Sequence, residues 1–286
     1  MTQKLLDLSG KINGPVLEIL EAISNIADSL NIQFFVVGAE ALDIIVHYGY
    51  GVEMIRATED IDLGVMVEDW DKFTDLKEAI IGSGTFDHGR APQRFFYKGN
   101  FPIDILPFGQ ISTPEYSIEW PEFEGIEMST LGFQESFDNS ILVRLITGPD
   151  FEIRFASLAG LAAMKLISWK DKYPEREKDA KDLLFIMHNY VEAGNFERIY
   201  NGKDSDILED DAVDYELMSA RLLGRDVAMI VRPESKEYIL KILNEETGER
   251  RHYKLAVDMR RSYGSDELEA NLNLLEAFKK GFLDID

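Results

Sequence analysis

The stretch Gly38–Asp62, GAEALDIIVHYGYGVEMIRATEDID, decides our prediction of the fold. It follows a short apolar run at 33–37, which we expect to be a buried strand, and it opens with a glycine turn before a helical segment. It ends on Asp60-Ile61-Asp62, at the start of a second β-like run at 61–67. Side chains alternate along a strand, so residues i and i+2 face the same way. The carboxylates of Asp60 and Asp62 are therefore expected to project together.

A third carboxylate, Asp104, lies inside the apolar run 101–108. If this run is a strand beside 61–67, three carboxylates converge. Carboxylates this close repel one another, and a divalent cation between them removes that cost. Mg²⁺ combines one or two protein carboxylates with substrate phosphates, so the pattern indicates phosphoryl-transfer chemistry. The alternative is that the Asp-x-Asp pair is merely exposed and Asp104 is an ordinary strand-edge acid.

The rest of the chain predicts an α/β (α+β) domain over 1–155 and a mainly helical region over 156–286. In the first part we expect helices at 15–30, 39–47 and 71–81, and hairpins pairing 94–98 with 101–108 and 141–146 with 151–155. In the second part we expect helices at 157–169, 175–191, 214–223, 233–243 and 265–282. The acidic stretch 203–216 is predicted to be a solvated loop that leads into a helix, and 224–232 has no clear pattern.

The composition excludes several classes of protein. The chain has 286 residues, 30 Lys plus Arg against 53 Asp plus Glu, a net charge of −23, and no cysteine. A thiol nucleophile, a disulfide scaffold and a Cys-ligated metal site are therefore excluded. Such acidity prevents the chain from holding nucleic acid by bulk charge, so a nucleotide substrate needs metal ions or a local basic patch. We expect no membrane segment, no signal peptide and a cytoplasmic location.

Two motifs of the deciding stretch resemble a known family. Gly38-Ala39 and Arg56-Ala57-Thr58-Glu59-Asp60-Ile61-Asp62, followed by Asp104, resemble Gly-Ser…Arg-x-Thr-x-Asp-x-Asp and the third carboxylate of DNA polymerase β-type nucleotidyltransferases. The closer resemblance is to the AbiEii/AbiGii-type enzymes of abortive-infection and type IV toxin–antitoxin systems. It implies a nucleotidyltransferase fold with a mixed sheet and flanking helices.

The resemblance also implies roles for these residues. Asp60, Asp62 and Asp104 would hold Mg²⁺ (or Mn²⁺), and the turn at Gly38 and Ala39 would approach the triphosphate of the nucleotide. Ala39 departs from the family, because it removes the hydroxyl that would touch phosphate and leaves only backbone N–H groups. We expect Arg56 to clamp a carboxylate or phosphate and Thr58 to orient Asp60. A surface arginine and a strand-favouring threonine are the alternatives.

A downstream motif extends the resemblance. Lys165 and Lys178-Asp179-Ala180-Lys181-Asp182 resemble the family's apolar helix with a lysine, followed by Lys-Asp-x-x-Asp. The resemblance implies that Lys165 meets the triphosphate and that Asp179 or Asp182 supports catalysis. Lys165 lies among apolar residues and needs an anionic partner if it is buried; alternatively, it reaches solvent along its stem. Asp179 and Asp182 share a helix face, and plain surface ion pairs are their alternative role.

Together these features predict a nucleotidyltransferase that moves a nucleoside monophosphate from an NTP to an acceptor hydroxyl. The acceptor is expected to be tRNA or a protein, and an antitoxin is an expected partner. The segment 165–181 carries six basic residues and is the expected docking place for a polyanion. One alternative is a catalytically silent nucleotidyltransferase fold with a binding or regulatory role, which Ala39 and the acidity favour. Another is an acidic interaction protein for a basic partner.

Overall fold

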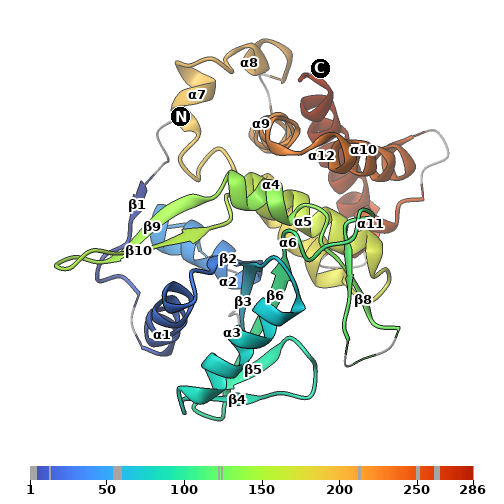
Figure 1. Cartoon of the computed structure of the whole chain (residues 1–286). Coiled ribbons are helices and arrows are strands. Elements are labelled where there is room, and N and C mark those ends of the chain that lie inside the picture. Colours follow the sequence, from blue (N-terminus) through green and yellow to red (C-terminus); the bar gives the residue numbers. More distant parts are fainter. Residues whose placement is uncertain are drawn as a thin grey trace. The chain divides into compact units, whose positions relative to one another are not determined.

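The structure, a computed structural model, describes residues 5–12, 14–53, 60–121, 123, 125–211, 214–248, 252–260 and 265–285. The chain forms two compact units, Met1–Ser157 and Leu158–Asp286, which we call unit 1 and unit 2 (Figure 1). Among the described residues, no helix combines the length and the apolar character needed to cross a membrane.

A mixed sheet forms the centre of unit 1. Within the described residues its strand order is β1-β9-β10-β2-β3-β6-β5-β4 (Figure 1). The strands are β1 (Leu5–Asp7), β2 (Gln33–Val37), β3 (Ile61–Met66), β4 (Phe86–His88), β5 (Arg94–Tyr97), β6 (Phe101–Phe108), β9 (Ile141–Ile146) and β10 (Phe151–Phe155). A separate ribbon pairs β7 (Ser117–Glu119) with β8 (Glu127–Ser129). The mixed sheet and the many helices confirm the predicted fold class.

Strand β3 is the central element for the site. It pairs antiparallel with β2 and parallel with β6, with Asp62 directly opposite Asp104. On its other side β6 pairs antiparallel with β5 in the predicted hairpin, with Arg94 opposite Asp104. The turn places Lys98 and Gly99 at φ 48° and 76°, which suits the tight connection between twisted strands. Side chains in register on neighbouring strands share a face, so three charged side chains meet there.

Within the described part of unit 1, five helical segments flank this sheet: α1 (Pro15–Ser29), α2 (Gly38–Asp43), the π-helical η1 (Ile44–Gly49), α3 (Trp70–Gly82) and α4 (Phe133–Asp138). Phe133 and Phe137 of α4 pack edge-on against Phe35 of β2, with ring centroids 6.5 and 5.5 Å away. Gly64 makes room for Phe35, because a Cβ at Gly64 would lie 2.3 Å from that ring. An aromatic core therefore continues the sheet face that carries Asp62 and Asp104.

Unit 2 is helical in all of its described regular structure. Its helices are α5 (Leu158–Asp171), α6 (Glu177–Asn189), α7 (Phe196–Tyr200), α8 (Asp206–Asp211), α9 (Tyr215–Ile230), α10 (Pro233–Thr247), α11 (Lys254–Asp258) and α12 (Ser265–Leu283). α9 and α12 approach to backbone contact at Gly224 and Gly281. A Cβ added at Gly224 would lie 2.0 Å from the Phe278 carbonyl oxygen, and one at Gly281 would lie 1.9 Å from the Arg221 carbonyl oxygen.

The prediction of a solvated loop at 203–216 is wrong in part. Asp204 is only 6% exposed, and it forms ion pairs of 2.8 Å with Arg198 and 3.5 Å with Arg225. Asp206 begins the short helix α8 and also pairs with Arg225. Arg225 belongs to α9, which runs on through the segment that had no clear pattern. Arg198, six residues before Asp204, and the more distant Arg225 thus neutralise acids that look solvated in the sequence alone.

Candidate functional site

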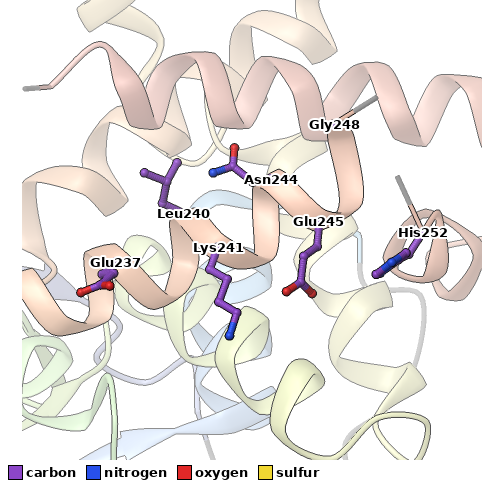
Figure 2. Close-up of a pocket in the computed structure, with 7 residues that line it drawn as sticks. All are labelled: Glu237, Leu240, Lys241, Asn244, Glu245, Gly248 and His252. Atoms are coloured by element: carbon purple, nitrogen blue, oxygen red, sulfur yellow. The ribbon is translucent and has the colours of Figure 1, made fainter. Parts of the chain in front are cut away.

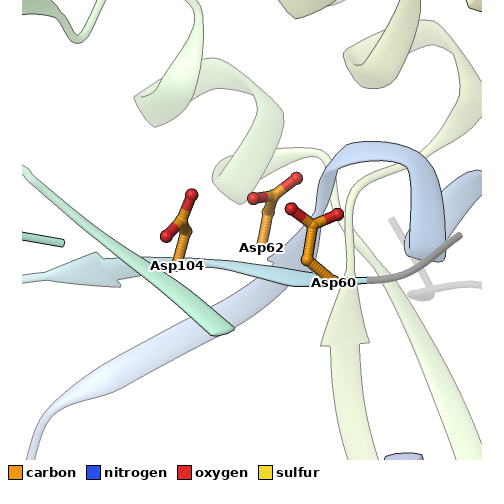
Figure 3. A group of neighbouring side chains, drawn as sticks. All are labelled: Asp60, Asp62 and Asp104. Carbon is orange, nitrogen blue, oxygen red and sulfur yellow. The ribbon is translucent and has the colours of Figure 1, made fainter. Parts of the chain in front are cut away.

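Three carboxylates converge at one edge of the central strands of unit 1. Asp62 and Asp104 lie in register on β3 and β6, and Asp60 stands one residue before β3. One oxygen from each of the three lies within 4.8 Å of the other two. Figure 3 shows the three side chains rising from the same side of the sheet. Strand alternation predicts this shared orientation, and the parallel pairing of β3 with β6 supplies the third member.

Gly38 fits closely against this cluster. It follows β2 with φ 73°, a conformation that a residue with a side chain rarely adopts. Its neighbour Val37 pairs with Asp62 across the sheet. A Cβ at position 38 would lie 2.0 Å from one carboxylate oxygen of Asp62. Glycine is therefore required twice, by the backbone angle and by the space that the Asp62 carboxylate fills.

Arg94 is the basic partner of the cluster. Its Nε donates to Asp104 Oδ1 at 2.5 Å and its Nη2 donates to Asp104 Oδ2 at 2.7 Å. The same Nη2 lies 3.3 Å from Asp60 Oδ2. Burial works against the charge of Arg94, but the hydrogen bond and the charge of Asp104, reinforced by Asp60 and Asp62, raise its pKa further. Arg94 is therefore a permanent cation at this site.

Glu40 is a further acid beside the cluster. Burial raises the pKa of Glu40 to about 7, and the charges of Asp43 and Asp60 act in the same direction. The resemblance to the nucleotidyltransferases offers no role for an acid at this position. One of the three carboxylates that we expect to hold metal, Asp60, therefore acts on the charge of Glu40.

The residues at the cluster fit a divalent metal ion of the magnesium type. Three carboxylates offer oxygen ligands only, which is the donor set that Mg²⁺ and Mn²⁺ prefer. Among the residues that the structure describes, no other set of three or more His, Asp or Glu side chains comes close enough to share an ion. Three negative charges and the one positive charge of Arg94 leave a net −2, which a single divalent ion neutralises.

Unit 2 holds a second buried ionic group. Lys165 of α5 pairs with Asp179 at 2.8 Å and with Asp182 at 2.7 Å, both on α6. The two aspartates are 3% and 6% exposed, so they are not the surface pairs of the alternative interpretation. Burial alone would lower the pKa of Lys165, but the two carboxylates outweigh it and raise that pKa above its ordinary value. Lys165 therefore carries its charge inside unit 2 and does not reach freely into solvent.

The other predicted site residues have different outcomes. Ala39 occupies the first turn of α2 and is half-buried. Arg56 and Thr58 lie outside the described residues. Part of the basic stretch 165–181 is already engaged, because Lys170 pairs with Glu245 and Lys181 pairs with Glu177, each at 2.5 Å. The stretch is therefore less available to a polyanion than its sequence predicts.

Sequence reasoning missed Arg94, although a usable pattern is present. The predicted hairpin across Gly99-Asn100 pairs Tyr97 with Phe101 and Arg94 with Asp104. Counting back from the turn would have put this arginine opposite the embedded acid. The raised pKa of Glu40 could not be predicted from the sequence, since it depends on burial and on Asp43 and Asp60 together.

A hollow of about 540 Å³ lies on the surface of unit 2 (Figure 2). It is lined by residues of α10 and the segment that follows: Glu237, Leu240, Lys241, Asn244, Glu245, Gly248 and His252. None of the predicted site residues lines it. One of its acids, Glu245, pairs with Lys170.

Comparison with known proteins adds three results. The sequence profile of one family, described as "Nucleotidyl transferase AbiEii toxin, Type IV TA system", matches residues 19–258. The sequence matches none of the curated proteins.

The third result is a likeness to solved nucleotidyltransferase structures. The crystal structure of ANT(2")-Ia in complex with adenylyl-2"-tobramycin is 13% identical, with a TM-score of 0.38, and the match covers 65% of this chain and 99% of that one. A solution structure of the antibiotic-resistance factor ANT(2'')-Ia is 14% identical, with a TM-score of 0.35 and coverages of 65% and 92%. The CCA-adding enzyme in apo form II is 14% identical, with a TM-score of 0.32 and coverages of 95% and 84%.

Proposed function

The chain belongs to the AbiEii nucleotidyltransferase family, and from that premise we propose that it transfers a nucleoside monophosphate from an NTP to an acceptor hydroxyl in a reaction that needs Mg²⁺ or Mn²⁺. The observation that carries the proposal is the convergence of Asp60, Asp62 and Asp104 within 4.8 Å, fitted against Gly38. In this reaction the acceptor oxygen forms a bond to the α-phosphorus of the NTP. The bond from the α-phosphorus to the bridging oxygen breaks, and pyrophosphate leaves.

We assign the following roles in unit 1. Asp60, Asp62 and Asp104 hold the ion, which when bound neutralises charge on the triphosphate. Asp104 also takes the proton of the acceptor hydroxyl. Gly38 keeps the backbone open beside Asp62, and Ala39 offers its backbone N–H toward phosphate. Arg56 and Thr58 complete the nucleotide-binding set by their place in the motif.

We assign supporting roles in unit 2 and expect two kinds of macromolecular partner. From the family motif alone we assign Lys165 to the triphosphate and Asp179 and Asp182 to the support of catalysis; within unit 2 both aspartates pair with the Lys165 ammonium. The charge of −23 weakens attraction to nucleic acid, so a protein hydroxyl is nearly as plausible an acceptor as tRNA. An antitoxin is the expected regulatory partner, because the family is that of type IV toxin–antitoxin systems.

Calorimetry with Mg²⁺ and each NTP tests the metal assignment. We expect the wild-type protein to bind at least one NTP in a Mg²⁺-dependent manner. The double variant Asp60→Ala, Asp62→Ala should lose this binding, since two of the three carboxylates are gone. Asp71→Ala, Asp75→Ala is the matched control, because these two acids are exposed on α3 of the same unit and the charge change is equal. Equal NTP binding by the wild type and the Asp60, Asp62 variant would refute the assignment.

A second candidate function is a binding or regulatory protein with a silent site. The observation that favours it is Ala39, which removes a hydroxyl at the expected phosphate turn. This candidate predicts NTP binding with no transfer of label to total RNA or to protein, whereas the leading proposal predicts transfer.

A further inference from the structure

Arg94 occupies the cluster in a way that affects how the cluster can bind metal. Its guanidinium forms a two-pronged contact with both oxygens of Asp104. Only 13% of the Asp104 side chain and 29% of the Arg94 side chain are exposed, so solvent screens this pair less than a surface pair. The geometry therefore fixes the plane and the position of the Asp104 carboxylate.

The same guanidinium also reaches Asp60, which stands one residue before β3. Nη2 lies 2.7 Å from Asp104 Oδ2 and 3.3 Å from Asp60 Oδ2, so one nitrogen bridges two of the three carboxylates. The Arg94 guanidinium therefore already occupies part of the region that attracts cations. Each divalent ion that enters meets the attraction of three carboxylates and the repulsion of one guanidinium.

The charges set a limit on the number of ions. With Arg94 the three carboxylates carry −2, and one divalent ion brings this group to zero; Glu40 beside it adds at most one more negative charge. A second divalent ion would therefore leave a net positive charge in a partly buried site, which is unfavourable until a triphosphate brings its own negative charge. Without Arg94 the cluster would carry −3, and the first ion would be held more tightly.

We propose that Arg94 is a positioning residue that holds Asp104 and supplies a fixed positive charge, so that the nucleotide-free protein binds one divalent cation at Asp60, Asp62 and Asp104 and not two. The inference rests on the proposed function, because it takes these three carboxylates as the metal site. It goes beyond that function by assigning a role to a residue outside the motifs.

Three single variants separate charge from geometry. Arg94→Gln removes both the positive charge and the two-pronged contact with Asp104. Arg94→Lys keeps a positive charge but cannot form the two-pronged contact. Arg90→Gln is the matched control, since Arg90 is an exposed arginine four residues away and the change in net charge is the same.

The experiment measures Mn²⁺ binding to the nucleotide-free protein by electron paramagnetic resonance and calorimetry. The wild type, Arg90→Gln and Arg94→Lys are expected to bind a single ion with similar affinity. Arg94→Gln is expected to bind the first ion about tenfold more tightly, and to take a second. In a transfer assay Arg94→Lys should be slower than the wild type, because Asp104 is no longer fixed, although its Mn²⁺ affinity is unchanged.

Two different results would overturn the inference, and they can be told apart. If Arg94→Gln binds Mn²⁺ with wild-type affinity and stoichiometry, or if Arg90→Gln shows the same gain, the role of Arg94 is refuted and the metal site stands. If the double variant Asp60→Asn, Asp62→Asn binds Mn²⁺ as the wild type does, or if none of the proteins binds it, the proposed metal site fails and the inference fails with it.

Discussion

Gly38 shows at the residue scale how tightly the candidate site is built. Its φ of 73° and the 2.0 Å separation between a notional Cβ and Asp62 both oppose any side chain. We expect Gly38→Ala to lower the free energy of unfolding by about 2 kcal/mol or more, as the sum of a left-handed backbone penalty and a displaced carboxylate. Its Mn²⁺ affinity should also fall. Chemical denaturation and calorimetry measure the two effects.

Gly10 provides a control for this substitution. It has nearly the same φ, 75°, but a Cβ there would meet nothing within 4 Å. Gly10→Ala is therefore expected to cost about 1 kcal/mol and to leave Mn²⁺ binding unchanged. Equal effects of the two substitutions on stability and on Mn²⁺ affinity would contradict the close fit between Gly38 and Asp62.

The raised pKa of Glu40 predicts that the free energy of unfolding depends on pH. Its pKa is about 7 in the folded protein and near 4.5 in the unfolded chain. Between these pKa values the unfolded chain gives up its proton more readily than the folded protein. The free energy of unfolding therefore falls as pH rises from 5 to 8, by about 2.5 kcal/mol from this group. Glu40→Gln should remove that part of the decrease. Urea unfolding at pH 5 and pH 8 in EDTA measures it.

An exposed glutamate serves as the comparison for Glu40. Glu68→Gln, in the same unit, is expected to keep the wild-type pH dependence. If Glu40→Gln loses as much stability between pH 5 and pH 8 as the wild type does, the carboxyl of Glu40 does not have the raised pKa described above.

At the scale of elements, the sequence predicts correctly those strands and turns that depend on short local patterns. β2 and β6 lie where their apolar runs predict, and the β5–β6 hairpin follows from its glycine turn. The parallel pairing of β3 with β6 brings Asp104 to Asp60 and Asp62, yet nothing local to either strand specifies it. Parallel partners are joined by long connections, so their register depends on the whole sheet.

Short elements and buried ion pairs were less predictable. β1 is three residues long and gains its place only by pairing with β9, far along the chain. The helix α9 continues past Leu223 to Ile230, and the partners of its Arg225, Asp206 and Asp284, are not revealed by a single stretch of sequence. In the same way, Lys165 could be recognised as odd in an apolar helix, but its partners on α6 could not be assigned from spacing alone.

The contact between α9 and α12 gives a prediction at this scale. In an isolated helix Gly→Ala is stabilising by up to about 1 kcal/mol. At Gly281 the added Cβ would lie 1.9 Å from the Arg221 carbonyl oxygen, a backbone atom that cannot turn away. Gly281→Ala is therefore expected to lower the free energy of unfolding of the full chain by about 2 kcal/mol.

Gly82 is the matched position for that substitution. It is the last residue of α3, and a Cβ there would meet nothing within 4 Å. Gly82→Ala should be neutral or slightly stabilising. Thermal and chemical denaturation measure the stability of both variants. A Gly281→Ala protein as stable as the wild type would mean that α9 and α12 are not in backbone contact.

At the scale of the whole molecule, the acidic residues behind the charge of −23 are not all solvated surface groups. Asp60, Asp62 and Asp104 form a cluster that we expect a metal ion to neutralise, whereas Asp179 and Asp182 share the single positive charge of Lys165 inside unit 2. Part of the basic stretch 165–181 is likewise paired with acidic residues, because Lys170 contacts Glu245 and Lys181 contacts Glu177. Attraction to an RNA acceptor is therefore expected to depend on bound metal rather than on lysine alone.

The central claim is that the chain transfers a nucleoside monophosphate with the help of the three-carboxylate site. The most direct measurement incubates the full chain with NTP labelled at the α- or the γ-phosphate, Mg²⁺, and total RNA or protein. The account predicts that α-label becomes covalently attached to an acceptor, that γ-label does not, and that EDTA or Asp60→Ala, Asp62→Ala abolishes the transfer. Attachment of γ-label, or α-label transfer that survives the loss of Asp60 and Asp62, would contradict it.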